Sequence, residues 1–228
     1  MGARDRHVRS GASPYPGLVL LLTDPAVAAV RVLECGEDLV DLRETPELRV
    51  DPRKQDGDGA WARVRTGILD RLLVAQQALP PTVRLLIIEG HRPAALQRHY
   101  FDSHRADLAR AHPDWSPRRL DAEASMHVSP LEVAPHPCGS AVDLTLTDNG
   151  DELDLGTAVN ATPEVSAHAC FTAADNIPTG AREWRRVLCE ALSGAGLVNY
   201  PPEWWHWSYG DRYWAAVTGS ECSIYAPR

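Results

Sequence analysis

Three segments of the chain carry residue types that can do chemistry together. Residues 136–143 place an imidazole, His136, on a loop with Gly and Pro, and then a carboxylate, Asp143. The second segment is Glu203-Trp-Trp-His206, and the third is the turn Glu89-Gly-His-Arg92-Pro after a short apolar run. Two imidazoles and a carboxylate match a catalytic zinc site, which takes three nitrogen and oxygen ligands and keeps a fourth position open. Glu203 would then be a general base that is not itself a ligand.

The interval between Glu203 and His206 restricts the backbone that can carry such a site. Residues three apart lie on one side of a helix, whereas an odd interval puts them on opposite faces of a regular strand. The zinc hypothesis therefore needs a helical turn, a bend or a bulge in this segment. The sequence leaves these three alternatives open.

Two further residues near these segments are candidates for the site. Cys138 lies two residues after His136 and could compete as a zinc ligand, although the adjoining Gly139 favours a turn residue. His168 is a candidate to line the site. The alternative for every such residue is structural, since a lone His or Asp is usually solvated or hydrogen-bonded, and tryptophans such as Trp204, Trp205 and Trp207 usually pack in a core.

The elements that must position these residues follow from hydrophobic periodicity. Apolar residues recur at helical spacing over residues 61–79 and 181–195, with Thr179 expected to cap the second helix. Alternation over residues 141–146 predicts a half-buried strand in which Asp143 points away from the hydrophobic side. Helices, strands and turns follow one another without regular βαβ units, so we predict an α+β fold with a central, mainly antiparallel sheet flanked by helices. Further predicted elements are a strand at 83–88, a helix at 94–111 and a short helix opening at Ser116-Pro117.

Composition bounds the organisation and the partners. The 228 residues suit a single domain, here residues 17–228 after a flexible arm at 1–16. The formal net charge of −8 makes a nucleic-acid or anionic-membrane partner unfavourable, because both require a positive surface. Five scattered cysteines without a CxxC pair, and the absence of a recognisable signal segment, predict a cytoplasmic protein. The oligomeric state is left open.

The three chemical segments together resemble the signatures of the VanX-type zinc D-alanyl-D-alanine dipeptidases, within the LAS metallopeptidases. Residues 134–143 are similar to the pattern S-x-H-x-x-G-x-A-x-D, residues 203–206 to E-x-W-H, and residues 89–93 to the turn D/E-G-Y-R-P. The order and spacing agree over roughly residues 30–215, and Leu155-Gly-Thr between the segments also matches. The resemblance implies the LAS/hedgehog-like zinc peptidase fold.

The resemblance also implies a role for each matching residue. One Zn²⁺ per chain would be bound by His136, Asp143 and His206, with Glu203 as the catalytic base and Arg92 stabilising the transition state. Two positions depart from the family pattern. Its first Ser is Ala134 here, and the acidic residue that it has shortly after Leu-Gly-Thr is Asn160. The candidate substrate-binding residues are Ala134, Asn160, Trp205 and His168.

The predicted function is therefore hydrolysis of a small peptide substrate, D-alanyl-D-alanine or a related dipeptide, in cell-wall biogenesis or degradation. Two alternatives remain. One is a LAS-type zinc amidase for a peptidoglycan fragment or a specialised-metabolite peptide, which the neutral residues Ala134 and Asn160 motivate. The other is a zinc-stabilised binding module without catalysis.

Overall fold

The computed structural model describes residues 20–228, so the predicted arm at residues 1–16 lies outside the described residues. The helices are α1 (Pro25–Ala28), α2 (Thr66–Ala78), α3 (Ala94–Ala111), α4 (Pro117–His127), α5 (Thr179–Gly194) and α6 (Arg212–Thr218). The strands are β1 (Arg31–Val32), β2 (Leu39–Asp41), β3 (Arg49–Val50), β4 (Arg63–Arg65), β5 (Val83–Glu89), β6 (Ala141–Asp148), β7 (Asp151–Glu152), β8 (Val198–Tyr200), β9 (Glu203–Ser208) and β10 (Cys222–Ser223).

The main sheet has the strand order β3-β5-β6-β9-β8, and β7 pairs with β6. Only β3 and β5 run parallel in this sheet of the described chain, and the other neighbours are antiparallel. The predicted α+β fold with a mainly antiparallel sheet is therefore confirmed. None of the helices within residues 20–228 has the length and apolar character needed to cross a bilayer.

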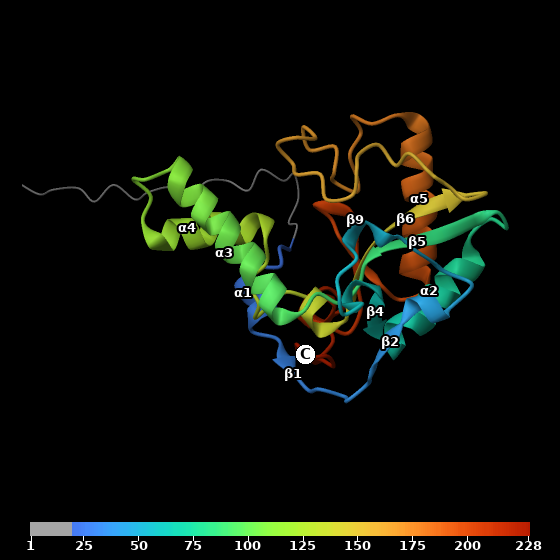
Figure 1. Ribbon diagram of the computed structural model, residues 1–228, viewed down its shortest axis with the longest axis horizontal. Helices are drawn as coiled ribbons and strands as arrows, with labels where there is room; N and C mark the ends of the chain where they lie inside the picture. The colour runs from blue at the N-terminus through green and yellow to red at the C-terminus, as the bar shows by residue number, and fades with distance from the viewer. Residues whose placement is uncertain (1–19) are drawn as a thin grey trace, which may run out of the picture.

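Helices α2 and α5 cover one face of the sheet and form the main core with it. They lie together at the right of Figure 1, whereas α3 and α4 lie at the left, on the other side of the sheet. The apolar stripes of α2 and α5 face the sheet, and their contact with it removes a large apolar area from water. The core includes Ile68, Leu72, Leu188 and Leu192 of the helices and Leu85, Ile87, Leu144 and Leu146 of the sheet.

The helix predicted over residues 61–79 begins later than expected, at Thr66. Trp61 lies in a 3₁₀ turn, Ala60–Ala62 (η3), and β4 follows and pairs with β2. The carboxylate of Asp56 accepts the backbone N–H groups of Ala60 and Trp61, at 3.0 and 2.9 Å, and so fixes the turn. Trp61 and Val64 are buried as the periodicity required, but from a non-helical backbone.

Two further predictions about local structure were wrong. Thr179 is the first residue of α5 and not its cap; Pro178 precedes the helix without a side-chain bond to it. By contrast, α4 opens at Ser116-Pro117 as predicted, and the hydroxyl of Ser116 caps it by accepting the backbone N–H of Arg119. Strand β6 is buried on both faces instead of one, with Asp143 only 2% exposed. Asp143 is shielded because it lines the site described next instead of facing bulk solvent.

Candidate metal centre and its cavity

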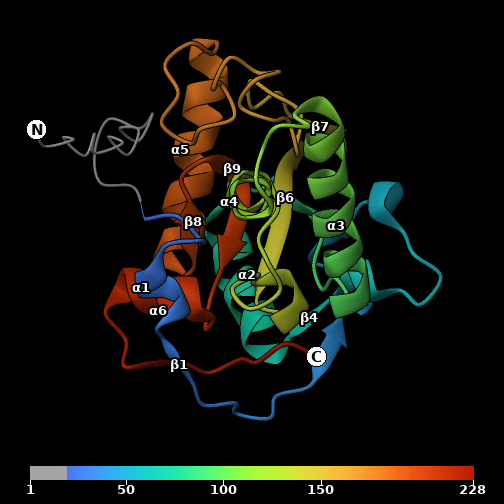
Figure 2. The same cartoon turned by 90° about the vertical axis from the view of Figure 1, so that its left-hand side faces the viewer.

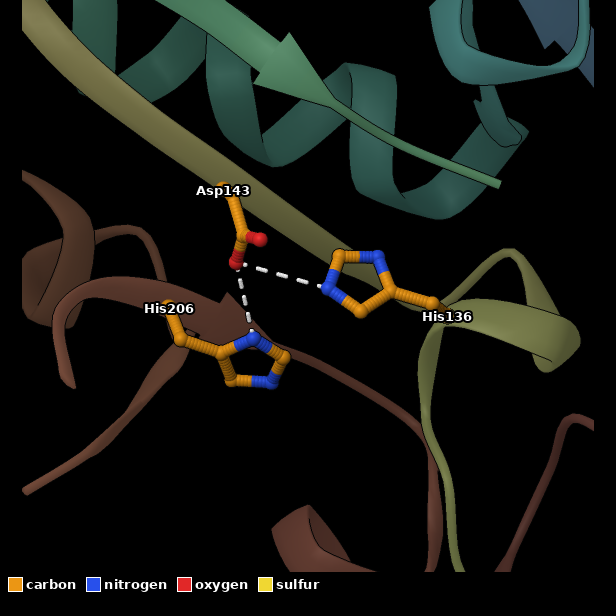
Figure 3. Close-up of side chains that lie close together, drawn as sticks. All are labelled: His136, Asp143 and His206. Carbon is orange, nitrogen blue, oxygen red and sulfur yellow. Dashed lines mark hydrogen bonds and ion pairs between the residues drawn. The ribbon is translucent and has the colours of Figure 1, made fainter. Parts of the chain in front are cut away.

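Two imidazoles and a carboxylate meet at one point, although they come from three segments of the chain. His136 lies in the 3₁₀ turn His136–Cys138 (η4), while Asp143 on β6 stands directly opposite His206 on β9. One potential ligand atom from each residue lies within 4.8 Å of the other two. Figure 3 shows the carboxylate of Asp143 between the two rings.

Two of the three distances between potential ligand atoms in this cluster are close to those around a tetrahedral ion. The Oδ1 atom of Asp143 lies 3.4 Å from Nε2 of His136 and 2.9 Å from Nδ1 of His206. Ligand atoms at about 2.0–2.1 Å from a tetrahedral Zn²⁺ are separated by about 3.3 Å, so one pair already has this spacing and the other must open by a few tenths of an ångström. Two nitrogens and one oxygen are also the donor set of catalytic zinc sites, so the residues fit the ion.

Cys138 does not belong to this cluster. Its thiol points to the backbone oxygen of Ala134 at 3.7 Å, and burial raises its pKa to about 12. A thiol that stays protonated is a poor metal ligand, because the thiolate is the form that binds. The turn role favoured from the sequence agrees with this geometry, since the next residue, Gly139, has φ +66°.

The ring of His136 is oriented by a backbone contact. Its Nδ1 atom lies 2.7 Å from the oxygen of Gly90. A carbonyl can only accept, so Nδ1 donates to it, and Nε2, which faces Asp143, is the nitrogen left for a ligand. Gly139 ends the same turn in the left-handed region, and a Cβ there would lie 2.3 Å from Cδ2 of Leu39. The turn therefore requires glycine at this position.

A β-bulge resolves the odd interval between Glu203 and His206. Asn199 of β8 pairs with Trp207, but the next residue, Tyr200, pairs with Glu203, so the intervening residues of β9 have no separate partners on β8. The Nδ2 group of Asn199 donates to the backbone oxygens of Glu203 and His206, each at 3.1 Å, and closes the bulge. As a result Oε2 of Glu203 lies 3.9 Å from Nδ1 of His206. Nothing in the sequence singled out Asn199.

The two carboxylates at the site have opposite electrostatic environments. Burial raises the pKa of Asp143, but His136 and His206 outweigh it and the net pKa is below its usual value. Asp143 is therefore an anion suited to a cation. Burial also raises the pKa of Glu203. The nearby His206 lowers this pKa and the negative charge of Asp143 raises it further, so that the pKa is about 7. A carboxyl group with such a pKa can accept and return a proton near neutral pH.

Arg92 is held by two side chains behind the site. Its Nε and Nη2 atoms donate to the two carboxylate oxygens of Glu89, at 2.7 and 2.8 Å. Its Nη1 atom donates to Oε1 of Gln97 at 2.8 Å, and Gln97 in turn donates to the oxygen of Ser129. A guanidinium has five N–H donors, so one on each Nη remains for a ligand. The sequence analysis missed Gln97, a polar residue that is only 2% exposed. Its position in the first helical turn after Arg92 was the one available signal.

A cavity of about 340 Å³ joins these groups. Its size is within the range of small-molecule sites in proteins. Every residue predicted for the site contributes to its lining, together with several that the sequence did not single out. The predicted lining residues are Arg92, Ala134, His136, Asp143, Asn160, His168, Glu203, Trp205 and His206, and the additional ones include Lys54, Gln97, Tyr100, Thr162 and Tyr200.

Comparison with known proteins places this chain among the peptidases, a class of hydrolases. A family model described as D-ala-D-ala dipeptidase matches residues 64–220, and the chain belongs to this peptidase family. The family predicted from the motifs is thus confirmed. Membership in a family of hydrolases also disfavours the alternative of a non-catalytic binding module.

Two curated relatives carry the same description. A D-alanyl-D-alanine dipeptidase from Synechocystis sp. is 29% identical over 220 residues, which cover 82% of this chain and 87% of the relative. A D-alanyl-D-alanine dipeptidase from Escherichia coli is 38% identical over 72 residues, which cover 31% of this chain and 35% of the relative.

Two solved structures are more distant. The zinc complex of the vancomycin-resistance D,D-pentapeptidase VanY is 20% identical with a TM-score of 0.34, and the match covers 75% of this chain and 84% of the other. The LD-carboxypeptidase LdcB is 18% identical with a TM-score of 0.40, and the match covers 81% of this chain and 72% of the other.

Proposed function

We propose that this chain is a zinc-dependent dipeptidase that hydrolyses D-alanyl-D-alanine or a closely related small dipeptide. The observation that carries the proposal is the cavity in which His136, Asp143 and His206 lie beside Glu203 and Arg92. The named relatives from Synechocystis sp. and Escherichia coli support the substrate class.

In this proposal three residues hold the ion and a fourth moves the proton. His136, Asp143 and His206 would bind Zn²⁺, which when bound lowers the pKa of water and polarises a carbonyl group. Glu203 accepts a proton from the attacking water and then delivers it to the leaving amine. Its side chain is suited to this, because it lies next to His206 and lines the cavity.

Arg92 would stabilise the negative charge that develops on the carbonyl oxygen of the substrate. Glu89 and Gln97 fix the plane of its guanidinium before the substrate binds, so little reorganisation is needed during the reaction. A lysine would not reproduce this, since its ammonium is a point charge on a flexible stem.

A second substrate class is supported by the same cavity. Asn160 and Ala134 line it with neutral side chains, so neither supplies the anion or hydroxyl that the family resemblance implies for a free dipeptide. A substrate without a free amine, such as a peptidoglycan fragment or an N-blocked peptide, would not need a carboxylate at Asn160.

A metal analysis with a substrate panel tests both possibilities. Purified protein is assayed for zinc content and then for hydrolysis of D-alanyl-D-alanine, its L,L isomer and its N-acetyl derivative. We expect about one zinc ion per chain and hydrolysis of the free D,D-dipeptide. Turnover of the blocked or longer amides alone would replace the dipeptide with the second class, and a zinc-loaded protein that cleaves no amide would contradict both.

A further inference from the structure

Arg65, the last residue of β4, is completely buried, and each of its five N–H groups has an acceptor. Nε donates to the backbone oxygen of Cys138 at 2.8 Å. Nη1 donates to Oε1 of Glu34 at 2.9 Å and to the oxygen of Glu37 at 2.5 Å. Nη2 donates to Oε2 of Glu34 at 3.1 Å and to the oxygen of Ala226 at 3.0 Å. The guanidinium therefore joins residues 34–37, the C-terminal residues and the turn that carries His136.

The turn that carries His136 is fixed through its backbone carbonyls. The oxygen of Cys138 accepts Nε of Arg65, and the oxygen of Gly139 accepts the backbone N–H of Arg65 at 2.8 Å. The oxygen of Pro137 accepts the backbone N–H of Arg228 at 2.9 Å. The oxygen of His136 accepts the backbone N–H of Arg92 at 3.3 Å. One arginine thus binds two of the turn's carbonyls, and the last residue of the chain binds a third.

The C-terminal tail, residues 222–228, completes the surroundings of Arg65. The ring of Tyr225 lies under the guanidinium, with 5.0 Å from Cζ to the ring centroid, and its hydroxyl donates to Oε2 of Glu37. The backbone N–H of Ala226 donates to Oε2 of Glu34 at 2.6 Å. Figure 2 shows the red tail running beside the blue segment that follows β1, although the two are far apart in sequence.

Stability alone is a weak reason for a buried ion pair, since well-packed apolar residues often stabilise a fold equally well or better. What an arginine adds is geometry, because its planar fork fixes several acceptors in one arrangement. Here two of those acceptors belong to segments remote from the site and one belongs to the turn that carries a metal ligand.

We propose that Arg65 is a positioning residue for His136, and that the C-terminal tail is part of the same support. Arg65 holds the backbone of the turn so that Nε2 of His136 stays directed at Asp143, and it contacts neither the ion nor the substrate. The assignment rests on the proposed function only in taking zinc as the ion at this cluster.

Arg185 of α5 provides a matched control. It is also buried, at 2% exposure, and it donates to three backbone oxygens, those of Leu155, Ala169 and Phe171. These acceptors lie in the irregular segment on the other side of the cavity and not in the turn that carries His136. Loss of either guanidinium costs stability, but only that of Arg65 is hydrogen-bonded to the turn that carries His136, whereas Arg185 stacks on the ring of Trp204, with 5.3 Å from Cζ to the ring centroid.

The test compares Arg65→Lys with Arg185→Lys by zinc affinity in a chelator competition, with the melting temperature of each metal-free variant measured alongside. Residues that orient metal ligands typically contribute roughly 10–100-fold in metal affinity, so we expect a loss of this size for Arg65→Lys and a change below about threefold for Arg185→Lys. Equal changes in the two variants, or unchanged affinity in Arg65→Lys, would overturn the proposal.

If Arg65→Lys does not fold, Glu34→Gln replaces it in the same chelator competition, because Glu34 binds both Nη atoms of Arg65. A loss of zinc affinity is expected, and unchanged affinity would overturn the role of Arg65. A milder variant tests the role of the tail. A chain that ends at Pro227 loses the bond from Arg228 to Pro137, and hydrogen exchange is then followed at the amides of Gly139 and Arg92 in metal-free protein. Faster exchange at both amides than in wild type is expected, and unchanged exchange overturns the role of the tail. This measurement needs no zinc. A wild-type protein that binds no zinc would therefore refute the proposed function, while the exchange result still decides whether the tail holds the turn.

Discussion

The two walls of the cavity are built in different ways. The wall with the candidate metal ligands consists of paired strands and one short turn, and His136, Asp143 and His206 are each 4% exposed or less. The facing wall belongs to residues 153–178, which contain neither helix nor strand. In it Asn160 and His168 are exposed at positive φ, 66° and 63°. Arg185 donates to three of its backbone oxygens, and Leu155 and Cys170 anchor it in the core.

This difference separates the chemistry of the site from its specificity. The ligand wall is fixed by bonds from many parts of the chain, so a change there disturbs several contacts at once. The facing wall has no paired strands or helices to fix its backbone, and the exposed positions of irregular loops of this kind tolerate substitution. Asn160, one of the two departures from the family pattern, lies on this second wall. The structure therefore restricts the type of reaction more than it restricts the identity of the substrate.

The largest effect is expected from removing a ligand. His206→Ala should lose zinc and lower kcat by more than about 10³-fold, because the ion contributes several kcal/mol to the transition state. His168→Ala, on the facing wall, is the control and should keep its zinc. Metal content by elemental analysis and hydrolysis rates measure both. A His206→Ala protein that retains one zinc per chain would contradict the role of His206 as a metal ligand.

A smaller effect is expected from Arg92. Arg92→Lys should lower kcat by about 10²–10³-fold with zinc content unchanged, since one fixed donor to a developing oxyanion is worth this much. Gln97→Leu should lower kcat less, because Glu89 still holds two nitrogens of the guanidinium. The exposed neighbour Arg98→Lys is the control. Near-normal turnover of Arg92→Lys would remove Arg92 from the mechanism.

The facing wall can be tested by a gain instead of a loss. Asn160→Asp adds a carboxylate to the cavity, so KM for the free dipeptide should fall by about tenfold, or ~1.4 kcal/mol, as for a hydrogen bond to a charged group. KM for the N-acetyl derivative should not improve, and Asn160→Leu should not reproduce the gain. If the free and blocked dipeptides respond alike to Asn160→Asp, then Asn160 does not face the substrate amine.

The smallest effect concerns stability. The pKa of Glu203 is raised from 4.5 to about 7, so the folded protein binds more protons than the unfolded chain between these values and loses stability as pH rises through this window. In metal-free protein, Glu203→Gln should raise Tm above pH 7 by about 2–4 °C, the shift expected from ~1 kcal/mol in a chain of this size. The gain should vanish below pH 4.5, where Glu203 is protonated in both states. Thermal melts across this range check it, with the exposed Glu132→Gln as the control.

The difference between the walls also decided what the sequence could predict. His136, Asp143 and His206 were predictable because metal chemistry restricts each position to a few residue types. The bulge that brings Glu203 beside His206 was required by that chemistry, but its construction was not predictable, since it depends on Asn199 of another strand. The start of α2 was misplaced because Trp61 and Val64 are buried from a 3₁₀ turn and a strand at a spacing that also suits a helix.

Gln97 and Arg65 show a second limit. Both are polar residues that bind segments distant in sequence, Gln97 to Ser129 in addition to its local contact with Arg92, and Arg65 to Glu34 and Ala226. Local pattern contains no signal for such contacts. They are found only once the fold has brought those segments together.

The central claim is that one zinc ion lies among three side chains of the ligand wall. Diffraction from zinc-soaked crystals at energies on both sides of the zinc absorption edge tests it directly. We expect one anomalous peak per chain at about 2.0–2.2 Å from Nε2 of His136, a carboxylate oxygen of Asp143 and Nδ1 of His206. A peak coordinated by Cys138, or no peak within reach of these three side chains, would contradict it.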